Sequence, residues 1–255
     1  MAELPGDDAA VPLSRRDRAR AGTVREIKGT ARRVLVDQGV DGLALRAIAR
    51  EMGMTAPALY RYFASREDLV EHVVADLYDE LTDVLETVRD AVAPARPGVQ
   101  LLEVARAFRR WATTHRAEFG LLFGSAGERV IRVEQLHGPG ERPPQVASRR
   151  FGGVFAELVA RIYLEQGFPV PADDDLEPAL QEQLREWCTK LPVALPLGVM
   201  SVFLSCWIRL YGMVCMEVFG HLRFALDDAE PMFEAELQAL GAVLGVADEY
   251  RPPST

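Results

Sequence analysis

Cysteine and histidine are scarce in this sequence, which argues against several kinds of site. The three cysteines, Cys188, Cys206 and Cys215, form no CxxC pair, and an odd number does not suit a disulfide framework. The four histidines are scattered, so the sequence lacks the Cys/His spacing of a metal site. We therefore expect no metal and no cofactor, and a reducing compartment such as the cytoplasm.

The sequence also lacks the motifs of common enzyme classes. It contains no P-loop, no GxGxxG, no HExxH and no serine nucleophile elbow. The acidic run Asp173–Asp175 lies in a proline-rich stretch, where its side chains are expected to be solvated. The chain is therefore expected not to be an enzyme.

Long uncharged apolar runs are rare, and Leu191–Ile208 is the one that requires a membrane test. Its 18 residues are near the lower limit for a spanning helix. Pro192 and Pro196 interrupt it, and Arg209 follows within the same periodic segment, so a buried helix at a subunit interface fits better. Residues 1–21 lack the apolar core of a secretory signal, so no export is expected.

Strand-like alternation of apolar and polar residues is absent over any useful length, whereas helical spacing recurs along the chain. The sequence therefore predicts an all-α protein. The expected helices cover 23–38, 45–52, 55–63, 65–92, 99–116, 145–166, 176–190, 197–222 and 229–246. The expected organisation is a flexible basic arm (1–21), a small helical domain (22–70), a larger one (71–246) and a tail (247–255).

Charge is distributed unevenly, although the whole chain carries a formal charge of −9. Between Arg15 and Arg66 there are 12 lysines and arginines against 5 aspartates and glutamates, a balance of +7. From residue 71 to the end there are 17 against 28, a balance of −11. Such asymmetry favours a nucleic-acid partner for the N-terminal part, although a solvated basic face would give the same balance.

Residues 45–63, LRAIAREMGMTAPALYRYF, have the pattern of a helix-turn-helix. Gly53 permits the positive φ of a tight turn, and Ala49 is small where two helices would cross. The expected core of this hairpin is apolar: Ile48, Met52, Met54, Leu59 and Phe63. That core leaves Ala56, Pro57, Tyr60 and Arg61 outward, on a helix that suits the major groove.

The stretch from Thr23 to Leu69 resembles the DNA-binding domain of TetR/AcrR-type transcriptional regulators, above all through RAIAREMGMTAPALYRYFASREDLV. The resemblance implies that double-stranded DNA is a partner. Tyr60 matches the tyrosine that often touches DNA, and Arg66 matches a basic residue that grips a phosphate beside a helix N-terminus. The residues that the resemblance assigns to DNA are Arg46, Thr55, Ala56, Pro57, Tyr60, Arg61, Tyr62 and Arg66.

Some positions depart from that family's pattern. Ala44 stands near a position where the family usually has Ser or Thr as helix cap and phosphate contact. Tyr62 stands where the family often has His. The arm is an addition to the core motif, and it either enters the minor groove or is a disordered tail. Its basic residues are Arg15, Arg16, Arg18 and Arg20.

Residues 203–222, FLSCWIRLYGMVCMEVFGHL, form a second motif. Trp207-x-x-x-Tyr211-Gly212 resembles the C-terminal regulatory domain called WHG, although Tyr211 replaces the family's His. The resemblance implies a homodimer in which the last two long helices pair with their symmetry mates, so that the dimer reads a palindromic operator. The alternative is that both faces are core in a monomer. The predicted interface is Ser201, Ser205, Ile208, Gly212, Cys215, Phe233, Leu237, Leu240 and Leu244.

Large aromatic residues are dense between the two motifs, where they either fill the core or line a cavity. The resemblance to TetR-type regulators favours a small-molecule site, and the scarcity of polar residues indicates a lipophilic ligand. The expected lining residues are Phe108, Trp111, His115, Phe119, Phe123, Phe151, Phe155, Phe203 and Trp207. Arg109 and Ser205 are further polar candidates.

The sequence thus predicts a ligand-responsive, DNA-binding transcriptional regulator that is released from its operator by a small lipophilic molecule. Two alternatives remain at this point. One is a DNA-binding activator or architectural protein without a ligand, whose aromatic middle is only core. The other is an all-α enzyme or interaction module in which the basic hairpin is incidental.

Overall fold

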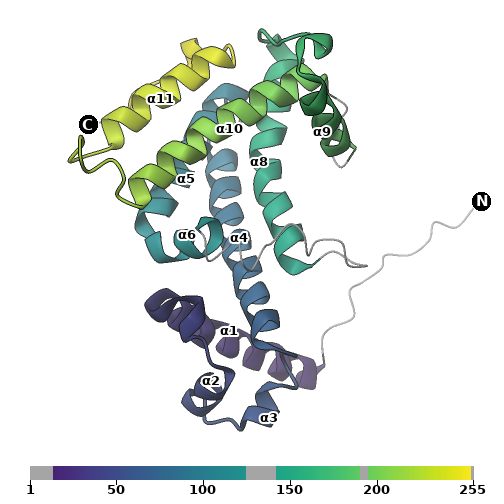
Figure 1. Cartoon of the computed structure of the whole chain (residues 1–255), viewed down its shortest axis with the longest axis vertical. Coiled ribbons are helices and arrows are strands. Elements are labelled where there is room, and N and C mark those ends of the chain that lie inside the picture. The colour runs from purple at the N-terminus through teal and green to yellow at the C-terminus, as the bar shows by residue number, and fades with distance from the viewer. Residues whose placement is uncertain (1–13, 125–141, 190–194, 254–255) are drawn as a thin grey trace, which may run out of the picture. The chain divides into compact units, whose positions relative to one another are not determined.

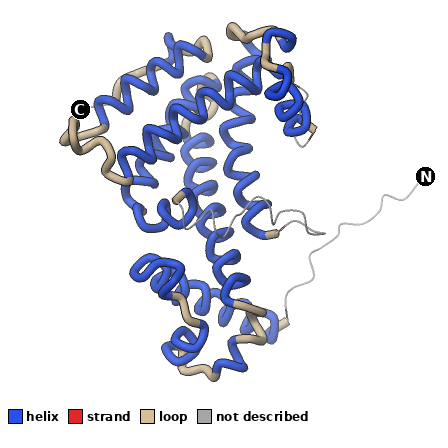
Figure 2. Tube along the Cα trace, in the orientation of Figure 1, coloured by secondary structure: helices blue, strands red, loops and turns tan. Residues whose placement is uncertain are grey.

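The computed structural model describes residues 14–124, 142–189 and 195–253, and the chain divides into two compact units, Met1–Val73 and Val74–Thr255. Within the described residues every regular element is a helix and none is a strand (Figure 2), which confirms the all-α prediction. Residues 1–13 of the predicted arm and the expected helix end at Lys190 lie outside the described residues.

The first unit is built from α1 (Arg15–Gly42), α2 (Leu45–Glu51), α3 (Ala56–Leu59) and the first residues of α4 (Arg66–Ala91), as Figure 1 shows. Apolar side chains at helical spacing close its core because each helix turns one stripe inward. The core side chains are Ile27, Ala31, Leu35, Leu43, Leu45, Ile48, Ala49, Leu59, Phe63, Leu69, Val70 and Val73. Met52 and Met54, predicted for this core, are only half-buried.

Helix α1 begins at Arg15, eight residues before the predicted start, so residues 15–21 are helical rather than a flexible arm. The reason is a cap that the prediction missed. Ser14 Oγ accepts a hydrogen bond from the Asp17 backbone N–H at 3.2 Å and donates one to the Asp17 carboxylate at 2.6 Å. Such a Ser-x-x-acid pair satisfies donors that a helix start leaves open. Gly39 breaks the helical geometry inside α1 with a φ of +70°, and this kink lies at the predicted helix stop.

The second unit contains the rest of α4, followed by α5 (Pro97–Thr114), α6 (Arg116–Phe123), α8 (Pro143–Gln166), α9 (Pro178–Cys188), α10 (Leu197–Val218) and α11 (Glu230–Val243). Helix α5 packs against α8, α10 and α11, and α10 also contacts α9 and α11 (Figure 1). The predicted helix 99–116 is divided, because His115 leaves helical geometry (φ −116°, ψ 51°) and α6 starts after it.

The predicted C-terminal tail is in part an integral element of this unit. A 3₁₀ turn, η3 (Ala247–Glu249), carries Glu249, which is buried. Its carboxylate accepts from the Val99 backbone N–H at 3.0 Å and pairs with Arg96 at 2.9 Å. Because this N–H belongs to the first turn of α5, the carboxylate caps that helix and fixes the segment in place.

Helix α10 is, among the described residues, long and apolar enough to cross a membrane by length and composition, with a mean hydropathy of 1.6. It packs against α5, α8, α9 and α11. Its buried residues lie on the side of those contacts, as in the core helix of a folded domain.

Candidate DNA-binding and regulatory sites

The turn between α2 and α3 fixes the direction in which α3 leaves the first helix of the hairpin. Gly53 has a φ of +65°, and the Met54 N–H donates to the Ala49 carbonyl at 2.7 Å. The end of α2 is thus closed by a residue in the left-handed backbone conformation, which only glycine adopts without strain. An ion pair between Arg33 and Glu51, at 2.8 Å, joins α1 to the end of α2.

Regular helix α3 is shorter than the predicted helix, but helix-like hydrogen bonds extend beyond its end to Phe63. The regular part ends at Leu59, while the N–H groups of Tyr62 and Phe63 still donate to the Leu59 carbonyl at 2.9 and 3.2 Å. Leu59 and Phe63 are buried, and they anchor this segment, residues 55–63, to the core. We call residues 55–63 the recognition segment.

Most of the residues predicted to contact DNA lie on the surface of the first unit. Tyr60 is 50% exposed, so its ring and hydroxyl are accessible from outside this unit. The exposed members of the predicted set are Arg46, Thr55, Pro57, Tyr60 and Arg61, whereas Ala56, Tyr62 and Arg66 are half-buried. Ala44 precedes α2 without any side-chain cap, as its methyl group dictates.

Tyr62 has a partner within its own unit. The Arg20 guanidinium carbon lies 5.0 Å from the centroid of the Tyr62 ring, and Arg20 Nη2 donates to the Arg61 carbonyl at 3.4 Å. Arg20 lies on helix α1. Through these two contacts it touches the end of the recognition segment.

The start of α4 follows the sequence closely. The Asp68 N–H donates to Ser65 Oγ at 3.1 Å, so Ser65 caps the helix start, and the Asp68 carboxylate accepts from the Ala64 N–H, one residue before the cap, at 2.7 Å. Backbone N–H groups and Ser65 lower the pKa of the Glu67 carboxyl. Arg66 lies 3.9 Å from Glu67 and 4.0 Å from Asp41, so these carboxylates partly neutralise its positive charge.

The aromatic residues predicted to line a ligand site are packed against one another in the second unit. Phe108 lies at ring-centroid distances of 6.1 Å from Phe119, 5.7 Å from Phe151 and 5.9 Å from Trp207. Phe119 and Phe123 are closer still, at 4.8 Å. These rings form a continuous cluster from α5, α6, α8 and α10, so most of the predicted lining residues fill the core in this structure.

Trp111 and His115 lie at the end of α5. Their rings stack at 5.0 Å, and His115 Nδ1 lies 3.1 Å from the Trp111 carbonyl. Trp111 Nε1 is buried and has no hydrogen-bond partner among the residues that the structure describes. An unpaired buried N–H is costly, and Trp111 lines neither the small cavity nor the groove described below.

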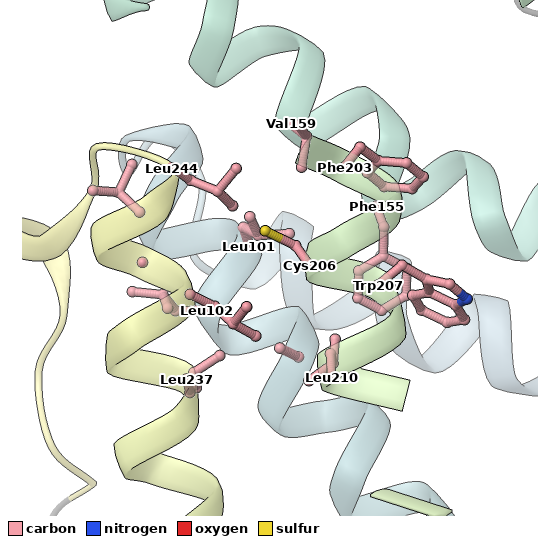
Figure 3. A pocket seen from close by; sticks show the side chains of 14 residues that line it. Leu101, Leu102, Phe155, Val159, Phe203, Cys206, Trp207, Leu210, Leu237 and Leu244 are labelled. Atoms are coloured by element: carbon pink, nitrogen blue, oxygen red, sulfur yellow. The ribbon is translucent and has the colours of Figure 1, made fainter. Parts of the chain in front are cut away.

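A small cavity of about 40 Å³ lies next to the aromatic cluster. Figure 3 shows Phe155, Phe203 and Trp207 on one side of it, and Leu237 of α11 and Leu244, just after α11, on the other. Three of the predicted ligand residues therefore border this cavity. It has room for a few water molecules and not for a drug-sized ligand, which needs several hundred Å³.

A wider groove, of about 490 Å³, lies between α4, α8 and α10. Its floor is apolar, and Val159 and Phe203 separate it from the small cavity because they line both. Charged side chains stand at its edge: Arg150 pairs with Asp83 at 2.8 Å and with Glu86. The other lining residues are Arg89, Gly153, Val154, Ala156, Glu157, Ala160, Arg161, Leu164, Leu195, Val199 and Met200. Of the residues that line this groove, only Phe203 was predicted as part of a ligand site.

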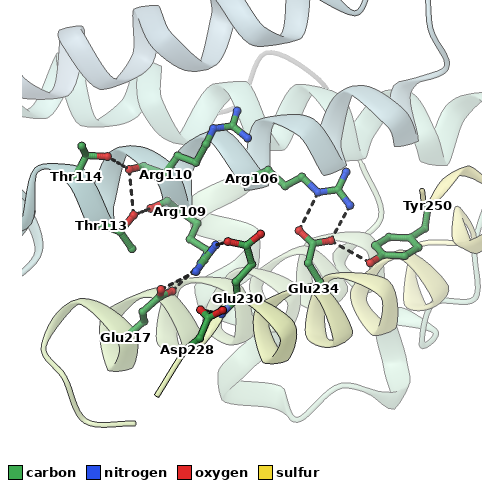
Figure 4. A network of polar contacts seen from close by, with 10 residues as sticks. All are labelled: Arg106, Arg109, Arg110, Thr113, Thr114, Glu217, Asp228, Glu230, Glu234 and Tyr250. Carbon is green, nitrogen blue, oxygen red and sulfur yellow. Dashed lines mark hydrogen bonds and ion pairs between the residues drawn. The ribbon is translucent and has the colours of Figure 1, made fainter. Parts of the chain in front are cut away.

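Arg109, predicted as a polar group of the ligand site, instead joins three helices. It makes two 2.7 Å bonds to Glu217 of α10 and one of 3.1 Å to Glu230 of α11 (Figure 4). One turn earlier, Arg106 pairs with Glu234 at 2.7 Å. Charge-assisted pairs of this geometry hold α10 and α11 against α5.

The structure separates the predicted dimer residues into two groups. Phe233, Leu237 and Leu240 of α11 and Leu244 just after it are buried inside the chain, so this stripe is core and the prediction that it forms the dimer interface is wrong. On α10, Ser205 and Ile208 are exposed, and Ser201, Gly212 and Cys215 are half-buried. Ile208 is 61% exposed, and Met232 on the neighbouring α11 is 50% exposed. The sequence could not distinguish the two faces of α11, because both carry apolar residues.

Two family models match the chain. The model described as bacterial regulatory proteins, tetR family, matches residues 27–73, and the model described as tetracyclin repressor-like, C-terminal domain, matches residues 101–240. The first match covers α2, α3 and the recognition segment, and the second covers the aromatic cluster and α10.

Curated relatives and solved structures agree with these matches. The HTH-type transcriptional regulators Rv1816 of Mycobacterium tuberculosis and Mb1846 of Mycobacterium bovis are each 34% identical over 240 residues, covering 90% of this chain and 95% of the relative. The crystal structure of regulatory protein SCO4313 has a TM-score of 0.65 and 28% identity over 89% of this chain and 98% of its own. A structure of RolR in complex with its ligand resorcinol has a TM-score of 0.53 and 15% identity over 93% and 98%.

Proposed function

The chain belongs to the tetR family of bacterial regulatory proteins, and we propose that it is a homodimeric, cytoplasmic repressor that a small lipophilic molecule releases from a palindromic operator. As a member of this family it is a DNA-binding transcription regulator and not an enzyme. What the proposal adds is the operator symmetry, the sign of regulation, the effector and the residues that carry each step.

The observation that carries the proposal is the exposed recognition segment on the basic unit. Tyr60 and Arg61 are exposed on a segment that the buried Leu59 and Phe63 anchor to the core, so its outer face can approach DNA. Thr55 and Pro57 at its start are small enough to approach base edges, while Arg46 and Arg61 supply charge for phosphates.

The dimer surface is proposed on the exposed faces of α10 and α11. On α10, Ser205, Ile208, Gly212 and Met216 follow one another at three- and four-residue spacing, and all are at least partly exposed. On α11 the exposed face carries Met232, Ala235, Ala239 and Val243 with the same spacing. Small and apolar residues on two adjacent helices suit close pairing with a symmetry mate.

The effector site is proposed in the groove between α4, α8 and α10. Its volume of about 490 Å³ falls in the range of small-molecule sites, and its floor of valine, alanine, methionine and phenylalanine favours a lipophilic molecule. RolR, which shares the fold, has a structure in complex with the small aromatic compound resorcinol. This supports a ligand site in the fold, and the groove offers more room here than the aromatic cluster.

Helix α4 is the proposed link between effector and operator. It starts at Arg66 in the first unit and contributes Glu86 and Arg89 to the groove in the second. An effector that contacts these side chains can favour one position of α4 over another and so shift the dimer between DNA-binding and released states.

The proposal is tested by selecting genomic fragments with the purified protein and titrating the best fragment at several salt concentrations. A palindromic site whose affinity falls steeply with salt is expected, because several phosphates are gripped by each dimer. A panel of lipophilic and polar compounds is then screened for release of that fragment. If no compound releases the DNA, the activator or architectural alternative replaces the ligand-responsive repressor.

A further inference from the structure

Arg20 lies outside the segment that matches the family model, which begins at residue 27, yet it reaches the recognition segment. Its guanidinium carbon is 5.0 Å from the Tyr62 ring centroid, and its Nη2 donates to the Arg61 carbonyl at 3.4 Å. The Ser14–Asp17 cap extends α1 far enough to place Arg20 on a helix. Two contacts thus join the first turns of α1 to the last turn of the recognition segment.

These contacts stabilise the C-terminal end of the recognition segment, which is poorly stabilised by its own hydrogen bonds. Its regular helix is only four residues long, and the carbonyl groups at a helix end have no partner within the helix. A cation placed at that end satisfies one such carbonyl and is favoured by the helix dipole. The face of a tyrosine ring attracts a guanidinium as well, so Arg20 braces both the backbone and a side chain.

We propose that Arg20 is a positioning residue for DNA recognition, which holds the end of the recognition segment through Tyr62 and the Arg61 carbonyl. Tyr62 is then the platform for Arg20 and not itself a reader of DNA. The inference rests on the proposed DNA-binding function, and it assigns to this basic residue a role other than a phosphate contact.

Positioning and phosphate contact predict different responses to salt. Loss of one exposed cation–π contact weakens each half-site by about 2- to 5-fold, hence a two-fold dimer by about 4- to 25-fold. If Arg20 only positions the segment, Arg20→Ala shows this loss while the slope of log affinity against log salt stays unchanged. If Arg20 gripped a phosphate, the slope would become shallower by about 2, since each protomer loses one contact of about 0.9.

Substitutions at both partners make the test specific. Arg20→Lys keeps the charge but not the planar guanidinium, so it is expected to resemble Arg20→Ala. Tyr62→Phe keeps the ring and is expected to bind as the wild type does, whereas Tyr62→Leu is expected to lose affinity. In the Tyr62→Leu background, Arg20→Ala should reduce operator affinity only slightly further. Arg18→Ala, two residues earlier on the exposed start of α1, is the control for removing one positive charge.

A measurement without DNA separates failure of this inference from failure of the proposed function. Amide hydrogen exchange at Tyr62 and Phe63 in the full-length protein is expected to be faster in Arg20→Ala and unchanged in Arg18→Ala. Unchanged exchange in Arg20→Ala, a slope shallower by about 2, or full affinity in Arg20→Lys overturns the positioning role. A wild-type protein that binds no operator overturns the proposed function, while the exchange experiment still decides whether Arg20 braces the segment.

Discussion

Arg109 of α5 and Glu217 of α10 form a bidentate ion pair with two hydrogen bonds of 2.7 Å, and both side chains are largely buried. The guanidinium carbon of Arg109 also lies 5.2 Å from the ring centroid of Phe233 on α11. The pair therefore joins the helix at the centre of the second unit to the two helices that carry the proposed dimer surface.

Truncation of one partner is expected to destabilise the second unit more than loss of both. Glu217→Ala leaves Arg109 buried and is expected to lower the unfolding free energy by about 3 kcal/mol, whereas Arg109→Met combined with Glu217→Leu should cost clearly less. Glu230→Ala removes the exposed, weaker partner of Arg109 and should cost under about 1 kcal/mol. Urea denaturation of the four proteins measures this, and equal losses for Glu217→Ala and Glu230→Ala would contradict it.

Glu234 is expected to make stability fall in acid. Burial opposes the charged form, but hydrogen bonds from Arg106 and Tyr250 outweigh it and lower the pKa of the Glu234 carboxyl below the ordinary 4.5. Because the folded-state pKa is the lower one, the contribution is present above pH 4.5 and is lost as the pH falls through the folded value. Glu234→Gln should be less stable than the wild type at pH 7, and this difference should shrink below pH 4.5. A constant difference at all pH values would show that Glu234 is not the titrating group.

The sequence predicted the helices well where caps and glycines mark their ends. The stops at Gly39 and Gly53 and the Ser65 cap of α4 are local signals, and the structure has each of them. The early start of α1 was also encoded, in Ser14 and Asp17, but was not recognised. The break at His115 has no such signal, because neither a glycine nor a proline stands beside it.

The candidate sites were less predictable than the helices, because they depend on which apolar face meets which neighbour. Helical spacing identified Phe233 and Leu237 as one stripe, yet only packing shows that this stripe faces α5 and α10 rather than a partner. Arg109 was predicted as a polar group of the ligand site, but its partners are more than a hundred residues away in sequence. Composition likewise cannot distinguish aromatic rings that line a cavity from rings that fill it.

Tyr60→Ala is expected to weaken operator binding by about 10-fold or more while the dimer stays intact, because a base or sugar contact worth 1–3 kcal/mol is lost. Arg61→Ala should instead make the salt dependence shallower by about 2 for the dimer. Operator titrations at three or more salt concentrations distinguish the two effects, and size-exclusion chromatography checks the dimer. Unchanged affinity in Tyr60→Ala would remove that residue from the interface.

Gly212→Leu is expected to break the dimer without harming the subunit. A Cβ added at Gly212 meets nothing within 4 Å inside the chain, and replacing a mid-helix glycine favours the helix. The new side chain would occupy the space that the partner helix needs. Gly152→Leu on α8, where a Cβ also meets nothing within 4 Å, is the matched control. Analytical ultracentrifugation should show a folded monomer for the first variant and a dimer for the second, and a dimer in both would place the interface elsewhere.

Ala156→Phe tests the groove as the effector site. Ala156 lines the groove and is half-buried, so a phenyl ring there fills part of the volume that a ligand would occupy. Once a releasing compound is known, this variant should bind the operator as the wild type does but need at least about 10-fold more compound for release, a loss of about 1.4 kcal/mol.

Ala179→Phe is the control for that experiment, because it adds the same ring at an exposed position of α9 outside the groove. It should leave the release concentration unchanged. If Ala156→Phe also leaves it unchanged, the effector does not occupy the groove. Release would then require the aromatic cluster to open, and Phe203, which lines both the groove and the small cavity, would be the residue to replace next. A smaller side chain there joins the two spaces, so Phe203→Ala should lower the concentration needed for release.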